Sequence, residues 1–261
     1  MTQKKIVITG ALGYIGTELC KLYSGFSWKY EVVAIDNRFV SERVNELKRR
    51  KIKFIQADIL NLDSIKHYIK EADVVHHLAG ITDVAYVKKE ANKEKDDLTT
   101  SVAIEGTANV LNSMKDDATI VFPSTHVVFE GLKEKKENID ESEQTNTFLS
   151  YSSSKVENEN QIINSGKNFA IFRLGSVYGF STDTMRINIM PNLFSKIASQ
   201  NGTIKLFGGG VQLKSLVPLI DVARCFKFVE EKNDFKNGVY NLTKENLTVK
   251  DVADICKKIN P

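Results

Sequence analysis

The 261-residue sequence contains little of what stabilises secreted or membrane proteins. Its three cysteines, Cys20, Cys225 and Cys256, lie far apart without paired spacing, so we expect buried free thiols rather than disulfides. No apolar run approaches the ~20 residues that a membrane-spanning helix needs. The first strand-like run begins at Ile6, which leaves no room for a signal peptide. We therefore predict a cytoplasmic protein without a membrane segment.

The net charge is also small, and histidines are few. The net charge of +3 is nearly neutral for this length, so neither nucleic acid nor a membrane surface is expected as a partner. The four histidines show no ligand spacing with cysteine or carboxylate, and we predict no metal site. His76 and His77 are adjacent in a strand-like run and must point to opposite faces. We expect both to be packed and hydrogen-bonded rather than to bind metal.

What the sequence does contain is a regular alternation of strand-like and helical patterns. Short β-branched runs occupy residues 6–8, 31–35, 54–57, 74–78, 119–122 and 169–174. Helical patterns lie between them, notably at residues 14–23, 62–70, 95–113 and 151–164. This alternation predicts an α/β fold with a doubly wound parallel sheet. The polar residues 131–146 are predicted to form a charged loop.

A glycine-rich turn, TGALGYIG, joins the first strand to the first helix. Gly10 suits the tight turn, Gly13 lets the backbone approach a pyrophosphate, and Gly16 lets the helix pack closely on the strand. Tyr14 and Ile15 open the helix, whose positive end attracts phosphate. A plain turn is the alternative, but the strand before it and the helix after it favour dinucleotide binding.

Acidic residues that follow the second and third strands indicate how an adenosine would be held. Asp36 ends the second strand, where its carboxylate can bind a ribose and repel a 2′-phosphate, which favours NAD over NADP. Asn37 and Arg38 come next, and the arginine would instead favour NADP. Asp58 and Ile59 follow the third strand. Asp58 is predicted to bind the adenine amino group, or else to cap the next helix or stabilise a loop turn.

Two later strands end in residues suited to a site at the carboxyl edge of the sheet. Leu78, Ala79 and Gly80 end the fourth strand, and these small residues would let the backbone lie against a cofactor. The fifth strand ends in Ser124 and Thr125, whose hydroxyls can orient a substrate hydroxyl or carbonyl. Ligands of open α/β sheets bind at this edge.

Tyr151 and Lys155 stand four residues apart in a helical pattern and therefore share one face. The ammonium group favours the charged phenol and lowers its pKa, which makes an acid/base that works near neutral pH. Such a pair is common by chance. Its expected position beside the dinucleotide turn and the hydroxyls of Ser124 and Thr125 makes chance a poor explanation.

Together these motifs resemble those of the extended short-chain dehydrogenase/reductases, in particular the NAD-dependent epimerase/dehydratase family that acts on nucleotide sugars. The matching motifs span nearly the whole chain: TGxxGxxG, the hydroxyl-bearing strand end, YxxxK, RLGSVYG at residues 173–179, FGGG at 207–210 and VYNL at 239–242. The resemblance implies a Rossmann-type NAD domain over residues 1–175. It implies a small substrate-binding lobe made mostly of residues 176–261, with segments such as 221–231 packing back on the first domain.

The sequence departs from the family pattern at several positions. Ala103 stands where the family usually carries asparagine, Ser176 replaces an asparagine that often contacts the sugar nucleotide, and Lys214 replaces a frequent arginine. His126 and Val127 replace the Asp-Glu pair of the sugar 4,6-dehydratases. Dehydration needs an acid and a base besides the tyrosine, so the resemblance argues against that reaction. The chain also ends earlier than members of the family usually do. Two explanations stay open, a small substrate lobe or a truncated sequence.

The resemblance implies a nucleotide-sugar 4-epimerase that uses NAD. Tyr151 would take the proton of the C4 hydroxyl while Thr125 or Ser124 holds that hydroxyl. Lys155 would lower the pKa of the tyrosine and bind the nicotinamide ribose. Thr125, His126, Ser176 and Lys214 would contact the substrate. The alternatives are a reductase or dehydrogenase of the same fold and a non-catalytic NAD-binding protein.

The resemblance further implies a homodimer in which the helices at residues 95–113 and 151–164 pair with their copies. Both helical patterns carry apolar stripes, formed by Leu98, Val102, Val110 and Leu111 in the first and by Val156, Ile162 and Ile163 in the second. The alternative is that both stripes face the chain's own sheet.

Overall fold

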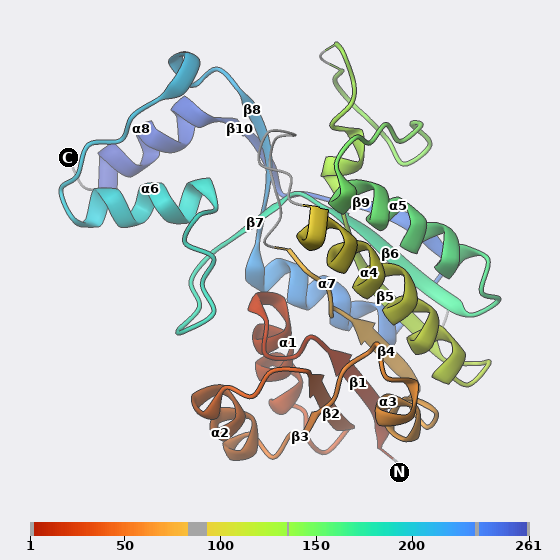
Figure 1. Cartoon of the computed structure of the whole chain (residues 1–261). Helices are drawn as coiled ribbons and strands as arrows, with labels where there is room; N and C mark the ends of the chain where they lie inside the picture. Colours follow the sequence, from red (N-terminus) through yellow and green to blue (C-terminus); the bar gives the residue numbers. More distant parts are fainter. Residues whose placement is uncertain (1–2, 83–92, 135, 233–234, 260–261) are drawn as a thin grey trace.

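A parallel seven-stranded sheet with the order β3-β2-β1-β4-β5-β6-β9 lies at the centre of the structure (Figure 1). The structure is a computed structural model that describes residues 3–82, 93–134, 136–232 and 235–259. The chain starts in the middle of the sheet at β1, runs outward to β3, returns to β4 and continues to the other edge. Strand order therefore reverses between β1 and β4, which is where ligands bind in such sheets.

The central strands are β1 (Lys4–Thr9), β2 (Tyr30–Asp36), β3 (Lys53–Gln56), β4 (Val74–His77), β5 (Thr119–Thr125), β6 (Asn168–Leu174) and β9 (Gly238–Leu242). A second sheet is formed by β7 (Ser176–Tyr178), β8 (Leu213–Pro218) and β10 (Glu245–Thr248). The helices are α1 (Tyr14–Ser24), α2 (Ser41–Arg49), α3 (Leu62–Ile69), α4 (Lys93–Ser113), α5 (Ser150–Ile163), α6 (Met190–Ser199), α7 (Leu219–Glu231) and α8 (Val249–Ile259), with short 3-10 turns η2 (His126–Phe129) and η3 (Phe207–Gly210).

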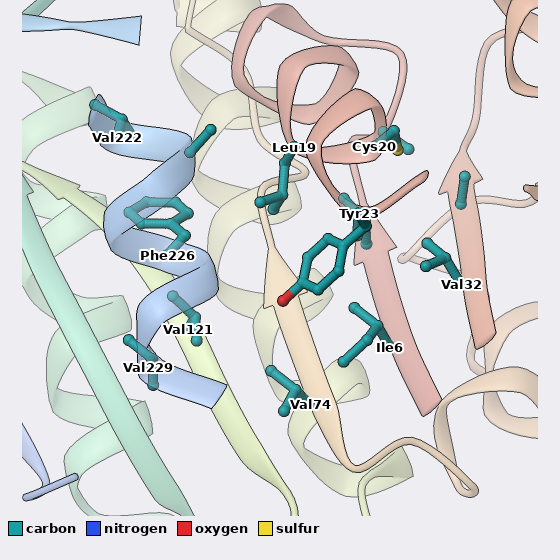
Figure 2. Packing of buried hydrophobic residues seen from close by; sticks show 14 of the residues in the cluster. Ile6, Leu19, Cys20, Tyr23, Val32, Val74, Val121, Val222, Phe226 and Val229 are labelled. Atoms are coloured by element: carbon teal, nitrogen blue, oxygen red, sulfur yellow. The ribbon is translucent and has the colours of Figure 1, made fainter. Parts of the chain in front are cut away.

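Helices cover both faces of the central sheet because its β-branched strands are apolar on both sides. On one face α1 and α7 lie side by side, and Figure 2 shows Tyr23 of α1 and Phe226 of α7 packed over Ile6, Val74 and Val121. The other face is covered by α3, α4 and α5, which together bury a second apolar cluster against the sheet. The fold holds the carboxyl ends of the strands in fixed register.

The smaller sheet forms its own layer with α6 and α8, whose apolar faces pack around Phe194, Leu216, Val252 and Cys256. Its strands come from three separate segments: β7 pairs with β8 in parallel and β10 pairs with β8 in antiparallel orientation. Between these segments the chain returns to the large sheet, where α7 packs on α1 and β9 pairs with β6. The chain thus passes several times between the lobe and the central sheet.

The predicted Rossmann-type α/β fold is confirmed, including all six predicted strands and the four predicted helices, with ends that differ by a few residues. Cys20 and Cys256 are buried thiols as predicted, whereas Cys225 is only partly buried. The apolar stripes of α4 and α5 divide between two environments. Their buried members are Val110, Leu111 and Ile162, while Leu98 and Ile163 are 52% and 44% exposed.

Candidate functional site

The glycine turn between β1 and α1 has the geometry of a phosphate-binding site. Gly10 has φ +67°, and a Cβ there would lie 2.7 Å from backbone atoms of Leu78 and Ala79. A Cβ on Gly16 would lie 2.4 Å from the carbonyl oxygen of Gly10, so neither position has room for a side chain. Gly13 precedes α1 without a side-chain cap. The first-turn N–H groups therefore remain available to an anion, which fits a dinucleotide pyrophosphate.

Asp36 lies buried at the end of β2, beside this turn, and its carboxylate is held from two sides. Oδ2 accepts a hydrogen bond from the backbone N–H of Leu12 at 3.0 Å, and Oδ1 accepts one from that of Arg38 at 3.1 Å. The Arg38 guanidinium also donates to Oδ1 at 3.0 Å, although most of this side chain is exposed. A ribose that binds at Asp36 must share the carboxylate with Arg38 or displace the guanidinium.

Asp58 stabilises the turn that follows β3. Its Oδ1 accepts a hydrogen bond from the N–H of Leu60 at 2.9 Å, and Oδ2 accepts one from the Asn37 amide at 3.1 Å. The residue that caps α3 is Asn61, which accepts a hydrogen bond from the N–H of Ser64 at 3.2 Å. Of the predicted roles of Asp58, the helix cap is wrong because Asn61 caps α3, the loop turn is confirmed, and the contact with adenine stays a prediction.

The residues after β4 run directly past the glycine turn. The N–H of Leu78 donates to the Thr9 carbonyl at 3.1 Å, and that of Ala79 donates to the Thr9 hydroxyl at 3.2 Å. Gly80 is exposed, and apart from its chain neighbours no described residue has an atom within 4 Å of the position of a Cβ. The backbone of this segment therefore forms one wall beside Gly10.

His76 and His77 lie on opposite faces of the sheet, as predicted. His77 is hydrogen-bonded at both nitrogens, to the hydroxyls of Thr9 at 2.9 Å and Thr107 at 3.0 Å. His76 contacts the Tyr23 hydroxyl at 2.8 Å through Nε2, but within the described residues its buried Nδ1 has no partner. The prediction that both are fully hydrogen-bonded thus holds only for His77. Burial lowers the pKa of both to about 3, so both are neutral.

Around Gly106, helix α4 packs closely against Ile59 and against α5. A Cβ on Gly106 would lie 2.4 Å from the side chain of Ile59, which is itself buried. The Asn158 amide of α5 donates to the Thr107 hydroxyl at 2.9 Å and to the Ala103 carbonyl at 2.8 Å. Since its side chain is part of the core, Ile59 can face a cofactor only through its backbone.

Lys155 directs its ammonium group at the end of β5. Nζ donates to the Pro123 carbonyl at 2.8 Å and lies 4.3 Å above the ring of Phe122. The same Nζ is 6.0 Å from the centre of the Tyr151 ring, one helical turn earlier on α5. Burial lowers the pKa of Lys155 to about 8, with the charge of Glu159 acting in the opposite direction. The structure thus brings Tyr151 and Lys155 together beside the strand that ends in Ser124 and Thr125.

The two hydroxyls at the end of β5 have different surroundings. Ser124 is buried and donates to the carboxylate of Glu159, which also binds Arg173 through its Nε at 3.1 Å and one terminal nitrogen at 2.8 Å. All three residues are buried. Thr125 accepts a hydrogen bond from the N–H of Val127 at 3.2 Å and begins η2. Its hydroxyl hydrogen remains available, whereas that of Ser124 is used in the buried cluster.

Glu130 anchors the beginning of α5, the helix that carries Tyr151. Its carboxylate accepts hydrogen bonds from the N–H groups of Phe148 at 3.1 Å and Leu149 at 2.9 Å, and from the hydroxyl of Ser152. This carboxylate at the positive end of the helix fixes α5 relative to η2. Sequence analysis assigned Glu130 no role, because the capping residue comes from a distant segment.

The predicted substrate contacts from the lobe lie near the end of β6. Ser176 pairs with Leu216 where β7 runs beside β8, and its side chain is partly buried. Lys214 is exposed on β8, and its positive charge acts on His126. His126 in turn lies against the carbonyl of Leu174, at 2.8 Å. His126, Ser176 and Lys214 therefore gather on the side of η2 where the lobe meets the sheet.

The segment at residues 179–186, here named the strap, fastens the lobe to the glycine turn. The Tyr14 hydroxyl donates to the Gly179 carbonyl at 2.5 Å, and Thr17 contacts Thr184 at 3.0 Å between hydroxyls. Arg43 of α2 donates to the Asp183 carboxylate at 2.7 Å and, through another nitrogen, to the Leu12 carbonyl at 2.8 Å. Sequence analysis missed this contact because no local pattern joins these distant segments.

Buried Asn192 of α6 completes the attachment of the strap. Its side-chain oxygen accepts a hydrogen bond from the N–H of Gly179 at 2.9 Å, and its amide donates to the Arg186 carbonyl at 3.0 Å. The Arg186 guanidinium donates to the Thr82 carbonyl at 3.2 Å, beyond β4. The strap therefore spans both sides of the expected cofactor site.

The portion of the chain that the structure describes contains neither a membrane-spanning helix nor a metal-binding cluster. Within residues 3–82, 93–134, 136–232 and 235–259, no helix has both the length and the apolar character needed to cross a membrane. The same residues contain no group of three or more histidine, cysteine or acidic side chains arranged to hold a metal ion.

Comparison with known proteins identifies relatives over nearly the full chain. The putative UDP-glucose 4-epimerase of Methanocaldococcus jannaschii is 28% identical over 261 residues, which cover 97% of this chain and 81% of that protein. The UDP-N-acetylglucosamine 4-epimerase of Methanobrevibacter ruminantium superposes with a TM-score of 0.82 at 20% identity, over 99% of this chain and 83% of its own.

A second solved structure, UDP-glucuronic acid 4-epimerase from Bacillus cereus in complex with UDP-glucuronic acid and NAD, has a TM-score of 0.80 and 25% identity, over 98% of this chain and 82% of that one. The sequence model of the NAD dependent epimerase/dehydratase family matches residues 6–243. The glycine turn and buried Asp36 agree with this match, and NAD is the cofactor. The chain belongs to the NAD-dependent epimerase/dehydratase family.

Proposed function

We propose that this protein is a nucleotide-sugar 4-epimerase. The observation that supports this most is the position of Lys155, whose Nζ is held between the Tyr151 ring and the Pro123 carbonyl. Pro123 directly precedes Ser124 and Thr125, so a phenol, an amine and a hydroxyl meet at the carboxyl edge of the sheet. The names of the similar proteins, which include 4-epimerases of three UDP-sugars, support the same reaction.

The residues that would hold NAD surround the point between β1 and β4 where the strand order reverses. Gly10, Gly13 and Gly16, with the N–H groups of Tyr14 and Ile15, would face the pyrophosphate. Asp36 would bind the ribose of the adenosine, with Asn37, Arg38, Asp58 and the backbone of Ile59 at the adenine end. The backbone of Leu78, Ala79 and Gly80 and the amine of Lys155 would line the nicotinamide end. When bound, NAD takes a hydride from the sugar carbon and returns it.

The side chains beside this cofactor would move and hold the proton of the sugar hydroxyl. Tyr151 accepts the C4 hydroxyl proton and gives it back after the keto-sugar has turned over. Lys155 favours the charged phenol while its own ammonium is held by Pro123. Of the two candidate hydroxyls, we assign the substrate contact to Thr125, because the hydrogen of Ser124 is directed at Glu159.

Epimerisation is favoured over dehydration because Val127, the second residue after Thr125, has no acidic or basic group. A 4,6-elimination requires an acid and a base besides the tyrosine. Val127 supplies neither. The nearby carboxylates of Glu130 and Glu159 are engaged by the start of α5 and by Arg173.

The test is incubation of the purified protein with UDP-glucose, UDP-N-acetylglucosamine and UDP-glucuronic acid, each with catalytic NAD. Proton NMR of the anomeric signals separates C4 epimers, and the absorbance of reduced nicotinamide detects net oxidation or reduction. We expect one sugar to equilibrate with its C4 epimer without net change in NAD. Stoichiometric consumption of NAD or NADH would instead support the dehydrogenase or reductase, and no turnover at all would support a binding protein.

We also propose that the protein is a homodimer through α4 and α5. Leu98 of α4 and Ile163 of α5 are exposed, and these two helices pack against each other. A cavity of about 370 Å³ is lined by residues of both helices, including Asn112 and Gln161. Burying two such apolar residues from each copy would stabilise the pairing by a few kcal/mol, about 1.5–3 for each fully buried side chain. Light scattering should give twice 29.3 kDa, and Leu98→Glu should shift it to the monomer mass. A wild-type monomer at micromolar concentration would contradict the proposal.

A cytoplasmic location, and the division into an NAD domain at residues 1–175 and a lobe at 176–261, stay predictions.

A further inference from the structure

His126 is the residue directly after Thr125, and its ring is held in one orientation. Its Nδ1 lies 2.8 Å from the carbonyl oxygen of Leu174. A carbonyl can only accept, so Nδ1 carries the hydrogen and Nε2 carries a lone pair. The hydrogen bond thus sets the tautomer of the ring.

Nε2 of His126 is the nitrogen left for chemistry. Among the described residues it has no hydrogen-bond partner, and it is not one of the fully enclosed unpaired atoms. The side chain as a whole is only partly exposed. Nε2 is therefore not enclosed in the core of the sheet, and it belongs to the residue that directly follows Thr125.

The surroundings keep this imidazole neutral. Burial lowers the pKa of His126 and the positive charge of Lys214 lowers it further, while the hydrogen bond to Leu174 acts in the opposite direction. A neutral imidazole is the form that takes up a proton. Among the described residues, the carboxylates of Glu130 and Glu159 are already engaged, and His126 is the base that directly follows Thr125.

We propose that His126 also exchanges a proton on a carbon next to C4, either C3 or C5. This inference rests on the proposed function, because these protons become acidic only when C4 is a carbonyl. His126 Nε2 takes the proton, the C–H bonding pair forms the carbon–carbon double bond of an enolate, and the carbonyl π electrons move to the C4 oxygen. Tyr151 and Lys155 then stabilise that oxygen. Return of a proton to carbon restores the ketone, and no oxidant or reductant is consumed.

The test supplies the ketone directly. Wild-type protein is incubated with UDP-4-keto-6-deoxyglucose in D₂O, and mass spectrometry follows the gain of deuterium on carbon. We expect exchange well above the protein-free rate, and His126→Asn should lower it at least about 100-fold. Asparagine keeps a donor for the Leu174 carbonyl but offers no base. His67→Asn, at an exposed histidine of α3, is the matched control and should exchange like wild type.

A second measurement needs no substrate. Nitrogen NMR of histidine-labelled protein should show one ring with hydrogen on Nδ1 and none on Nε2, lost in His126→Asn, and titrating below the ordinary histidine range. Hydrogen on Nε2 would overturn the inference, as would exchange no faster than in His126→Asn. C4 epimerisation of a UDP-sugar, without a gain of deuterium by the 4-keto sugar, would overturn the inference about His126 and leave the proposed function intact. A gain of deuterium without C4 epimerisation would support the inference about His126 and contradict the proposed 4-epimerase activity.

Discussion

The ammonium group of Lys155 is predicted to reduce the stability of the protein around neutral pH. Burial lowers its pKa from 10.5 to about 8, which means that the folded protein disfavours the charged form. A difference of this size corresponds to about 3 kcal/mol at pH values where the group is charged in both states. A lysine kept at such a cost is expected to have a function, and Lys155→Met measures the cost.

The direction in which stability changes with pH follows from the number of protons that the folded and the unfolded chain bind. Between about pH 8 and pH 10.5 the unfolded chain binds more protons at this lysine than the folded one, so wild-type stability rises with pH through that window. Methionine has no charge to lose. The loss of the hydrogen bond to the Pro123 carbonyl costs about 1–3 kcal/mol, but that cost does not vary with pH. The stability of wild type relative to Lys155→Met should therefore rise by about 2 kcal/mol between about pH 7 and about pH 9.5.

Urea unfolding of both proteins at the two pH values gives this difference, and other titrating groups cancel in it. Lys66→Met, at an exposed lysine of α3, is the control and should show no pH-dependent difference from wild type. The same Lys155→Met protein should lose turnover and bind NAD more weakly, since the amine serves both. A stability difference that stays constant with pH would refute the reasoning, because it would mean that the pKa of Lys155 is the same in the folded and the unfolded protein.

Three other substitutions test the site. Tyr151→Phe should lower kcat by about 10²–10⁴-fold and leave the NAD affinity from titration calorimetry nearly unchanged, and a loss below about tenfold would exclude Tyr151 as the acid/base. Asp36→Ala should reduce the preference for NAD over NADP by about tenfold or more, because it removes the ribose acceptor and releases Arg38; tighter binding of NADP by wild type would contradict the assignment. Arg43→Met should weaken NAD binding by about tenfold and Asp183→Asn by less than about threefold, since only the former loses the contact with the glycine turn. Equal effects would show that the contact of Arg43 with the strap, and not its hydrogen bond to the Leu12 carbonyl, determines the affinity for NAD.

The fold was predictable because its signals are local. Buried β-branched runs, helical periodicity and the glycine turn each depend on neighbouring residues, and the structure confirms the order of elements that they imply. The return of the chain to the large sheet as β9 is different. VYNL was identified only by family resemblance, since a short apolar run does not reveal which strand it will pair with.

Contacts between distant segments could not be predicted in the same way. Arg43 and Asp183 are 140 positions apart, and Tyr14 and Asn192 are 178 apart. Arginine, aspartate and asparagine are common on protein surfaces, so no local pattern marked these residues. The cap of α5 by Glu130 was missed for the same reason.

The hydroxyls at the end of β5 show where residue type alone is insufficient. Adjacent residues of a strand point to opposite sides, so Ser124 and Thr125 cannot both face a substrate. Choosing between them requires knowing what lies on each side. The buried pair of Glu159 and Arg173 lies on the side of Ser124, and a buried carboxylate needs every donor that it can reach. Ser124 is therefore a partner of that ion pair, and Ser124→Ala should be compared with Thr125→Ala. The former should chiefly lower the free energy of unfolding, and the latter should chiefly lower kcat.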